Sequence, residues 1–176
     1  MNVNDIRSNE ELKKYIKENG NPEFLFFYGG TYSQWWRAPF EVDGKYYYTS
    51  EHWMMAKKAE TFGDKDALSK IFTNESPSDV KAFGRKVKNF DPKVWAEVAF
   101  EHVVQGNVHK FTQNHHDHEQ LISDGDKVLV EASPYDKIWV IGFNEFTAPH
   151  LSVDEWNGTN LLGYAIMEAR KRIIDK

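Results

Sequence analysis

The most informative segment of this chain reads Thr49-Ser50-Glu51-His52-Trp53-Met54-Met55-Ala56-Lys57-Lys58-Ala59. Thr49 or Ser50 can cap a helix that begins here. Glu51 and Lys58 are seven residues apart. That is nearly two helical turns, so their side chains project in about the same direction, with Cα atoms roughly 10 Å apart. Ion pairs on one helix face need a spacing of three or four residues. The longer spacing suits two groups that converge on opposite sides of a sugar-sized ligand.

Each of the two charged residues also has a simpler interpretation. A carboxylate in the first turn of a helix, such as Glu51, complements the helix dipole and the unpaired N–H groups there. Lys58 by itself would be expected on the surface. The residues between them, from Trp53 to Ala56, are all apolar. A carboxylate and an amine in such a segment either reach solvent or serve a purpose, so we take both as candidate catalytic residues.

The composition predicts a single domain with a high aromatic content. The chain has 176 residues, 40% of them hydrophobic, with six Trp, eight Tyr and twelve Phe. This length suits one domain, and the aromatic residues can serve a core or a stacking surface for a flat ligand. The 22 basic and 27 acidic residues give a net charge of −5, which argues against a broad duplex-binding face. A small nucleotide pocket remains compatible with this charge.

The chain contains no cysteine, which excludes disulfides, thiolate nucleophiles and cysteine-ligated metals. This composition fits the cytosol. No apolar run approaches the length of a membrane span, and the polar segment from Met1 to Asn9 carries no secretory core. We therefore expect a soluble, cytoplasmic protein that does not enter a membrane.

The order of apolar segments and chain breakers predicts a helix-dominated α+β domain of about seven helices with a few short strands. Helices are expected over 9–18, 50–62, 65–72, 117–122 and 160–174, with two more beginning at Pro77 and Pro92. Strands are expected over 24–28, 40–42, 45–48, 127–132 and 137–143, with Asp43-Gly44 as a hairpin turn. No regular βαβ alternation is present. Residues 1–21 are predicted to be a helical extension of a domain over 22–176.

Two segments near the start of the chain are candidates for substrate binding. The Gly29-Gly30 turn could bring backbone N–H groups to a phosphate. A glycine pair is more often only a turn, and no Gly-Lys-Ser/Thr follows it. The segment after it combines hydrogen-bonding groups with stacking surfaces, or forms a packed loop; its residues are Ser33, Gln34, Trp35, Trp36 and Arg37.

Three later positions are further binding candidates. Arg85 could bind phosphate bidentately, although the basic run around it is by default a solvated surface. Asp136 precedes Trp139 and could simply form an Asx turn. Asn160 can cap the final helix. Gly163 inside that helix costs roughly 1 kcal/mol relative to alanine, which close packing or the approach of a ligand would explain.

The cluster His115-His116-Asp117-His118 raises the question of a metal site. Adjacent histidines on a helix do not face one site. His115 and His118 could do so, but no separate acid or histidine is placed to complete the ligand set. We predict a surface cluster at a helix junction and no metal.

The chain resembles the NADAR family, also called YbiA-like, in order from about Phe24 to Ile174. No single motif is diagnostic, but a chance match of the whole set is implausible. The matching segments in the first half are Ser33-Gln34-Trp35, Phe40-Glu41-Val42-Asp43-Gly44, Thr49-Ser50-Glu51-His52, Met54-Met55-Ala56-Lys57-Lys58-Ala59, Phe62-Gly63-Asp64 and Gly84-Arg85. Those in the second half are Lys110-Phe111, Val130-Glu131-Ala132-Ser133-Pro134, Asp136-Lys137-Ile138-Trp139 and Trp156 to Met167 with Asn160-Leu161-Leu162-Gly163.

The resemblance implies an N-glycosidase that cleaves the bond between ribose C1 and a nitrogen, without a cofactor. One branch of the family acts on phosphoribosylated pyrimidine intermediates of riboflavin synthesis. Others remove ADP-ribose from modified guanine in nucleic acid, and the family name reflects a link to NAD and ADP-ribose metabolism. The family's glutamate maps to Glu51, and its lysine, thought to form a Schiff base with the anomeric carbon, maps to Lys58. Its tryptophan and acid map to Trp139 and Asp136.

The chain departs from the family pattern after Trp139. Val140 stands where a glycine is usual, and Ile141 stands where the riboflavin-linked branch has an aspartate. A function that rests on this aspartate cannot be transferred. The expected substrate is therefore an ADP-ribosyl or related nucleotide, either a small molecule or modified nucleic acid.

The expected mechanism places a ribose between Glu51 and Lys58. Glu51, or Asp136, would protonate the departing base. A free lysine has a pKa near 10.4, so it must lose its proton to act as a nucleophile. Apolar neighbours favour the uncharged amine by desolvation. Trp35, Trp36 and Trp139 could stack the base, and Arg85 with the Gly29-Gly30 turn could hold phosphate.

Two other function classes use the same residues differently. A non-catalytic module would bind ADP-ribose or NAD in the same pocket without turnover. In a structural or interaction protein, Glu51 and Lys58 would be surface charges. Release of a base separates the enzyme from the binding module, and nucleotide-dependent stabilisation separates both from the third class.

Overall fold

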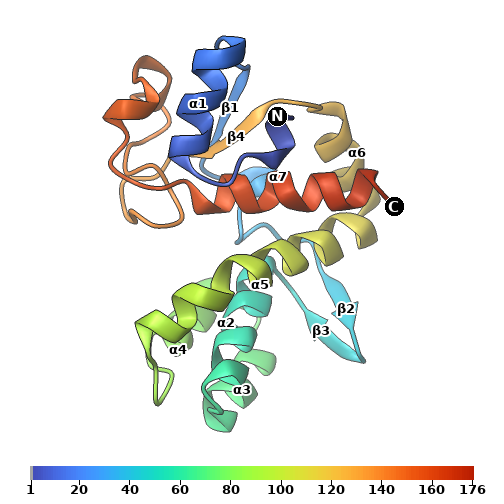
Figure 1. Cartoon of the computed structure of the whole chain (residues 1–176). Coiled ribbons are helices and arrows are strands. Elements are labelled where there is room, and N and C mark those ends of the chain that lie inside the picture. Colours follow the sequence, from blue (N-terminus) through green and yellow to red (C-terminus); the bar gives the residue numbers. More distant parts are fainter. Residues whose placement is uncertain (1) are drawn as a thin grey trace. The chain divides into compact units, whose positions relative to one another are not determined.

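The structure is a computed structural model that describes residues 2–176. These residues form seven α-helices, four short strands and four 3₁₀ turns (Figure 1). The chain divides into two compact units, one of residues 1–33 and 119–176 and the other of residues 34–118. We call them the terminal unit and the central unit. The predicted class, a helix-dominated α+β fold with few short strands, is confirmed.

The terminal unit is built on two parallel strands and the last helix. β1 (Phe24–Phe27) pairs with β4 (Val128–Glu131), so that Phe24 lies opposite Val128. The final helix α7 (Leu161–Ile174) packs against β4 and against the 3₁₀ turn η1 (Val3–Asp5). α1 (Asn9–Asn19) and two short turns, η3 (Ala148–His150) and η4 (Val153–Glu155), complete this unit. Its fully buried core includes Leu129, Val130, Ile166 and Met167.

The N-terminal residues are held in this unit by a buried arginine. Arg170 of α7 has no exposed surface. Its Nε donates to Asn4 Oδ1 at 2.8 Å, and one of its terminal nitrogens donates to Lys127 O at 2.8 Å. The start of the chain is therefore tied to α7 and to the entry of β4. The predicted division between an extension over 1–21 and a domain over 22–176 stays a prediction.

The central unit contains α2 (Ser50–Thr61), three helices that pack around it, and a β-hairpin. α2 packs against α3 (Lys65–Phe72), α4 (Pro77–Arg85) and α5 (Pro92–Gln113). The hairpin joins β2 (Phe40–Val42) to β3 (Lys45–Tyr47). Asp43 and Gly44 at its turn both have positive φ angles, of 52° and 75°, as a type I′ turn requires.

Glycines explain how the neighbouring helices approach α2 so closely. A Cβ on Gly84 of α4 would lie 1.9 Å from Met55 Sδ, and one on Gly106 of α5 would lie 2.5 Å from Trp53 Cδ1. The apolar run between Glu51 and Lys58 is thus packed on by two helices at once. Its composition has a structural cause that is independent of any ligand.

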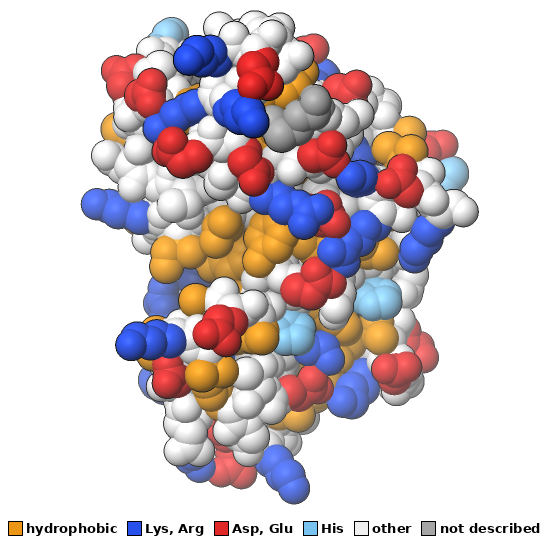
Figure 2. Space-filling view, in the orientation of Figure 1, with side chains coloured by type: hydrophobic (Ala, Val, Ile, Leu, Met, Phe, Trp, Pro, Cys, Tyr) orange, Lys and Arg blue, Asp and Glu red, His pale blue; other side chains and the backbone are white. Residues whose placement is uncertain are grey.

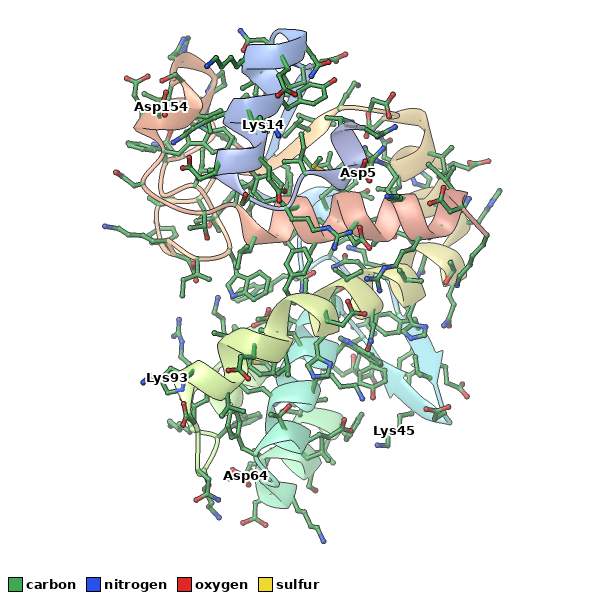
Figure 3. All side chains as sticks on the ribbon, viewed as in Figure 1. Asp5, Lys14, Lys45, Asp64, Lys93 and Asp154 are labelled. Carbon is green, nitrogen blue, oxygen red and sulfur yellow. The ribbon has the colours of Figure 1, made fainter. Side chains whose placement is uncertain are left out.

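Side-chain caps begin the helices of this unit at the predicted places. Thr49, Ser76 and Asp91 each accept a hydrogen bond from a backbone N–H in the first turn of α2, α4 and α5. Asp64, labelled in Figure 3, accepts from Ala67 N at 3.0 Å at the start of α3 and from Lys88 N at 2.8 Å. The helix α6 (His115–Ser123) is slightly longer than the predicted 117–122.

The predicted strand over 137–143 is wrong. Its carbonyls accept hydrogen bonds from the turn before α7 and from the start of α7 rather than from a strand: Lys137 O accepts from Thr159 N at 3.0 Å, and Trp139 O accepts from Leu162 N at 3.1 Å. Gly142 has a φ of 80°, which interrupts any extended run. The β-branched and aromatic residues of this segment therefore belong to an irregular loop.

Candidate active site

The start of α2 is fixed by a buried histidine. His52 Nε2 lies 3.0 Å from Asn74 O, and His52 Nδ1 lies 2.8 Å from Thr49 Oγ1. A carbonyl only accepts hydrogen bonds, so Nε2 carries the proton and Nδ1 accepts from the Thr49 hydroxyl. Burial is the main cause that lowers the pKa of His52, which favours this neutral form. The first turn of α2 is therefore held in one position.

Glu51 lies in that first turn and is only 5% exposed. Its backbone N–H donates to Gln34 O at 3.0 Å, which joins the predicted 33–37 segment to α2. A carboxylate in this position is favoured by the positive end of the helix dipole. Glu51 is thus a buried acid beside a segment that was predicted to bind substrate.

Lys58 lies near the other end of α2 and is half-buried. Its Nζ lies 4.1 Å from the centroid of the Phe90 ring. Burial lowers the pKa of Lys58, the negative charge of Glu51 opposes this, and the positive charge of Arg85 lowers the pKa further. The net direction is downward, toward the neutral amine that nucleophilic attack requires. Glu51, Lys58 and Arg85 therefore form one electrostatically connected group.

Three predicted binding residues of the central unit are Arg85, Trp35 and Trp36. Arg85 is in the last turn of α4 and is exposed. Trp35 is 45% exposed, with Lys81 Nζ 5.8 Å from its ring centroid. Trp36 donates from Nε1 to Asp117 Oδ1 at 3.2 Å. Exposed indole faces and a guanidinium are groups that can stack on a base and bind a phosphate.

The other candidates belong to the terminal unit, where Asp136 forms an Asx turn. Its Oδ1 accepts from Ile138 N at 2.5 Å and from Trp139 N at 2.8 Å. This is the simpler of the two interpretations considered for Asp136. The bonds fix the backbone that carries the half-buried Trp139. The role of Asp136 as a general acid stays a prediction.

Asn160 does not cap α7 with its side chain, although it stands at the position before the helix. Its Nδ2 donates to Leu129 O at 2.9 Å, and its Oδ1 accepts from Glu131 N at 3.1 Å. It adopts a left-handed conformation with φ of 52°. A Cβ on Gly163 would lie 2.0 Å from Leu129 O. Both residues therefore serve the close approach of α7 to β4, and close packing explains the helical glycine.

The Gly29-Gly30 pair and Ser33 form a turn after β1. Gly30 has a φ of 69°, whereas Gly29 is extended with φ of −134° and ψ of −160°. Ser33 N donates to Gly30 O at 2.9 Å. Positive φ requires glycine only at Gly30. A role of Gly29 and Ser33 in binding substrate stays a prediction.

Sequence reasoning missed two polar residues on α5. Asn107 and Lys110 have no exposed surface. Asn107 Nδ2 donates to Val103 O at 2.9 Å and to Gln34 Oε1 at 3.3 Å. Burial lowers the pKa of Lys110 to about 7, against the opposing charge of Asp117. The signal was present in the spacing, because both residues continue the buried stripe of Ala99 and Val103 at helical intervals.

Four further observations bear on ligands and surroundings. No group of three or more His, Asp or Glu side chains within residues 2–176 is arranged to hold a metal ion. No helix in this part of the chain is long and apolar enough to cross a membrane. On the face in Figure 2, acidic and basic side chains are interspersed. A shallow depression of about 220 Å³ includes neither Glu51 nor Lys58 among its lining residues, which are Gly63, Asp64, Lys65, Asp66, Lys88 and Asn89.

Comparison with known proteins places the chain in a family. The NADAR domain pattern matches residues 26–174. The N-glycosidase R617 of Acanthamoeba polyphaga mimivirus is 36% identical over 162 residues, covering 85% of this chain and 95% of that protein. Protein irg-1 of Caenorhabditis elegans is 27% identical over 179 residues, covering 92% and 84%. The NMR structure of the E. coli protein YbiA superimposes with a TM-score of 0.72 at 27% identity, covering 88% and 87%. This chain therefore belongs to the NADAR domain family and is an N-glycosidase.

Proposed function

We propose that this N-glycosidase removes ADP-ribose from a modified base such as guanine, or acts on a related ADP-ribosyl nucleotide, with Lys58 as nucleophile and Glu51 as acid and base. The observation that carries the proposal is the lowered pKa of Lys58, caused by burial and by Arg85, together with its coupling to the charge of Glu51. Partial desolvation of an amine increases the fraction that is uncharged and can act as a nucleophile. A buried carboxylate nearby can hold and return protons.

The chemistry balances in four steps. The neutral amine of Lys58 attacks C1 of the ribose, and the C1–N bond breaks as the base leaves with its electron pair and a proton from Glu51. The new secondary ammonium returns a proton to Glu51. The ring oxygen then leaves C1 and takes this proton, while the lysine nitrogen forms a C=N double bond. Water adds to C1 of this protonated Schiff base and gives a proton to Glu51, which restores its acid form. The carbinolamine then passes its hydroxyl proton to nitrogen and releases the neutral amine of Lys58, and the sugar closes again as a hemiacetal.

The residue at position 141 favours an ADP-ribosyl substrate over the riboflavin-pathway intermediates. Ile141 stands where the riboflavin-linked branch is expected to carry an aspartate, and it is fully buried with its backbone N–H bonded to Glu131 O at 3.1 Å. An apolar, buried side chain at this position cannot supply a carboxylate. The exposed guanidinium of Arg85 and the exposed ring of Trp35 offer a phosphate contact and a stacking face.

The test is a substrate panel combined with borohydride trapping. The enzyme is incubated with ADP-ribosylated guanosine, ADP-ribosylated single-stranded DNA, NAD and phosphoribosylated riboflavin intermediates, and released base is measured. We expect release from an ADP-ribosylated guanine substrate, and a borohydride-reduced adduct on Lys58 whose added mass is that of the sugar product less one oxygen. Release only from the riboflavin intermediates would contradict the substrate assignment. Binding of ADP-ribose without release from any compound would indicate a non-catalytic module.

The matched control for Lys58→Ala is Lys93→Ala. Lys93, labelled in Figure 3, lies in the first turn of α5 and is exposed. Lys58→Ala should lose both turnover and the trapped adduct, whereas Lys93→Ala should keep both. Full activity of Lys58→Ala, with no adduct trapped in the wild-type enzyme, would exclude the Schiff-base mechanism.

A further inference from the structure

Buried polar atoms without a partner gather at the start of α2. Six buried side-chain atoms within residues 2–176 have no hydrogen-bond partner, and three of them belong to Gln34, Ser50 and Asn107. Ser50 is the first residue of α2. Gln34 accepts from Glu51 N through its carbonyl, and its side-chain oxygen accepts from Asn107 Nδ2 at 3.3 Å. Ser50 and the backbone of Gln34 therefore adjoin Glu51, and Asn107 is linked to them through the side chain of Gln34.

The two amides present opposite hydrogen-bonding groups. Asn107 Nδ2 is fixed by two acceptors, Val103 O at 2.9 Å and Gln34 Oε1. Turning the Asn107 amide over would set its oxygen against Val103 O, so Oδ1 is the atom left without a partner. In Gln34 the oxygen accepts from Asn107, so Nε2 is the atom left without one. One acceptor and one donor are thus presented by side chains already bonded to each other.

Burying these atoms carries a desolvation cost that no hydrogen bond to the protein offsets. Position 107 lies on a buried stripe with Val103 and Phe111, where a leucine would avoid the cost. A group that both accepts and donates a hydrogen bond would satisfy the two amides together. A hydroxyl is the smallest group that does so.

We propose that Gln34 Nε2 and Asn107 Oδ1 bind the 2-hydroxyl of the ribose that is cleaved, and so select ribosyl over 2-deoxyribosyl substrates. This inference rests on the proposed function, because it takes Glu51 and Lys58 to act at C1, the carbon next to this hydroxyl. The hydroxyl accepts from the Gln34 amide and donates to Asn107. Gln34 is half-buried and lies beside the exposed Trp35, so rotation of its side chain admits the hydroxyl, which is then enclosed.

The experiment compares substrates that differ by one hydroxyl. The kcat/KM of the wild-type enzyme is measured for an ADP-ribosylated guanosine and for analogues that lack the 2- or the 3-hydroxyl of the cleaved ribose. We expect the loss of the 2-hydroxyl to lower kcat/KM on the order of 100-fold, because two buried groups lose their partner. Loss of the 3-hydroxyl should have a much smaller effect. A larger loss with the 3-deoxy substrate would overturn the assignment.

The variants Asn107→Leu and Gln34→Met test the residues. Each should lower kcat/KM for the ribosyl substrate and leave that for the 2-deoxy substrate nearly unchanged, so that the ratio falls toward one. Gln105→Leu, whose side chain bonds to Glu101 on the same helix, should keep the wild-type ratio. Equal losses on both substrates in Asn107→Leu would show a structural role only. The melting temperature of Asn107→Leu should be no lower than that of the wild-type protein. A lower melting temperature, with no change in the ratio of kcat/KM between the two substrates, would overturn the proposal and indicate that an ordered water binds the two amides.

A binding measurement separates this inference from the proposed function. ADP-ribose and its analogue without the 2-hydroxyl on the terminal ribose are titrated into wild-type and Asn107→Leu protein by calorimetry. A preference of the wild-type protein alone for the complete sugar supports the hydroxyl site, even if no base is ever released. Turnover of the substrate without any such preference would leave the glycosidase proposal standing and overturn the hydroxyl site.

Discussion

The starts of α2 and α7 look alike in sequence but differ in what their polar residues do. Both follow a turn, and both were predicted to contribute to the site, through Glu51 at α2 and through Asn160 and Gly163 at α7. At α7 the Asn160 amide bonds to the backbone of β4 on both of its sides. At α2 a buried carboxylate stands beside three polar atoms without a protein partner. The comparison teaches that a polar motif before a helix indicates function only where its hydrogen bonds remain incomplete.

The difference also appears in the electrostatics. Burial lowers the pKa of Lys58, the charge of Glu51 raises it, and the charge of Arg85 lowers it further. The start of α7 has no comparable group among its first residues, since Leu161, Leu162 and Gly163 are apolar. A lysine whose pKa is lowered by burial is typical of catalytic groups. This supports the proposal that α2 carries the chemistry, while packing accounts for Asn160 and Gly163, whose part in binding substrate stays a prediction.

The largest expected effect is on Glu51→Gln, which keeps the shape of the side chain and removes the acid. We expect kcat/KM to fall by roughly 10²–10⁴-fold, the usual contribution of a general acid and base. Steady-state kinetics on the substrate found in the panel measure this. Glu97→Gln, an exposed position on α5, is the control. Unchanged kcat/KM in Glu51→Gln would contradict the proposal that the start of α2 supplies the acid and base.

Gly163→Ala tests the packing half of the comparison. Its Cβ would meet Leu129 O at 2.0 Å, so α7 must move away from β4, which should lower the free energy of unfolding by about 3 kcal/mol. Urea denaturation measures this. Gly29→Ala is the matched control, because nothing lies within 4 Å of its added Cβ and its backbone is extended. If both variants unfolded at the same urea concentration, the close approach of α7 to β4 would not explain the glycine.

The lowered pKa of the buried Lys110 predicts that the stability of the protein depends on pH. Burial lowers the pKa of Lys110 to about 7 in the folded protein, against 10.5 for a free lysine side chain. The unfolded chain therefore binds more protons between these values, and the free energy of unfolding should rise with pH across this window by up to about 1.4 kcal/mol per unit. Lys110→Met removes this contribution, while Lys93→Met should keep the wild-type slope. Denaturation at pH 7 and 8.5 compares them; equal slopes for all three proteins would contradict the buried, neutralised amine.

The smallest expected effect concerns Arg85. Its positive charge lowers the pKa of Lys58, so Arg85→Met should raise that pKa and leave less neutral amine at neutral pH. The activity, which rises as Lys58 loses its proton, should shift to higher pH, with a loss of a few-fold at pH 7. The pH profile of kcat/KM measures this, with the exposed Lys86→Met as control. A loss of activity without a shift of the profile would assign Arg85 to substrate binding alone.

The sequence by itself determined the features that depend on neighbouring residues. Capping side chains set the helix starts at Thr49, Asp64, Ser76 and Asp91 within one turn. The Asp43-Gly44 pair determined the hairpin, because both residues adopt positive φ angles readily. The spacing of Glu51 and Lys58 on one helix followed in the same way from helical geometry.

Only the tertiary structure decided what depends on distant segments. The segment 137–143 has strand-like composition, but its backbone bonds to the turn before α7. The Asn160 side chain was expected to cap α7 and instead donates to the backbone of β4, which lies within hydrogen-bonding distance. Asn107 bonds to Gln34, which is distant in the chain, and the pKa of Lys58 is lowered mainly by burial and further by the charge of Arg85. Hydrogen bonds and desolvation act through space, so local propensity cannot show which polar groups will be satisfied.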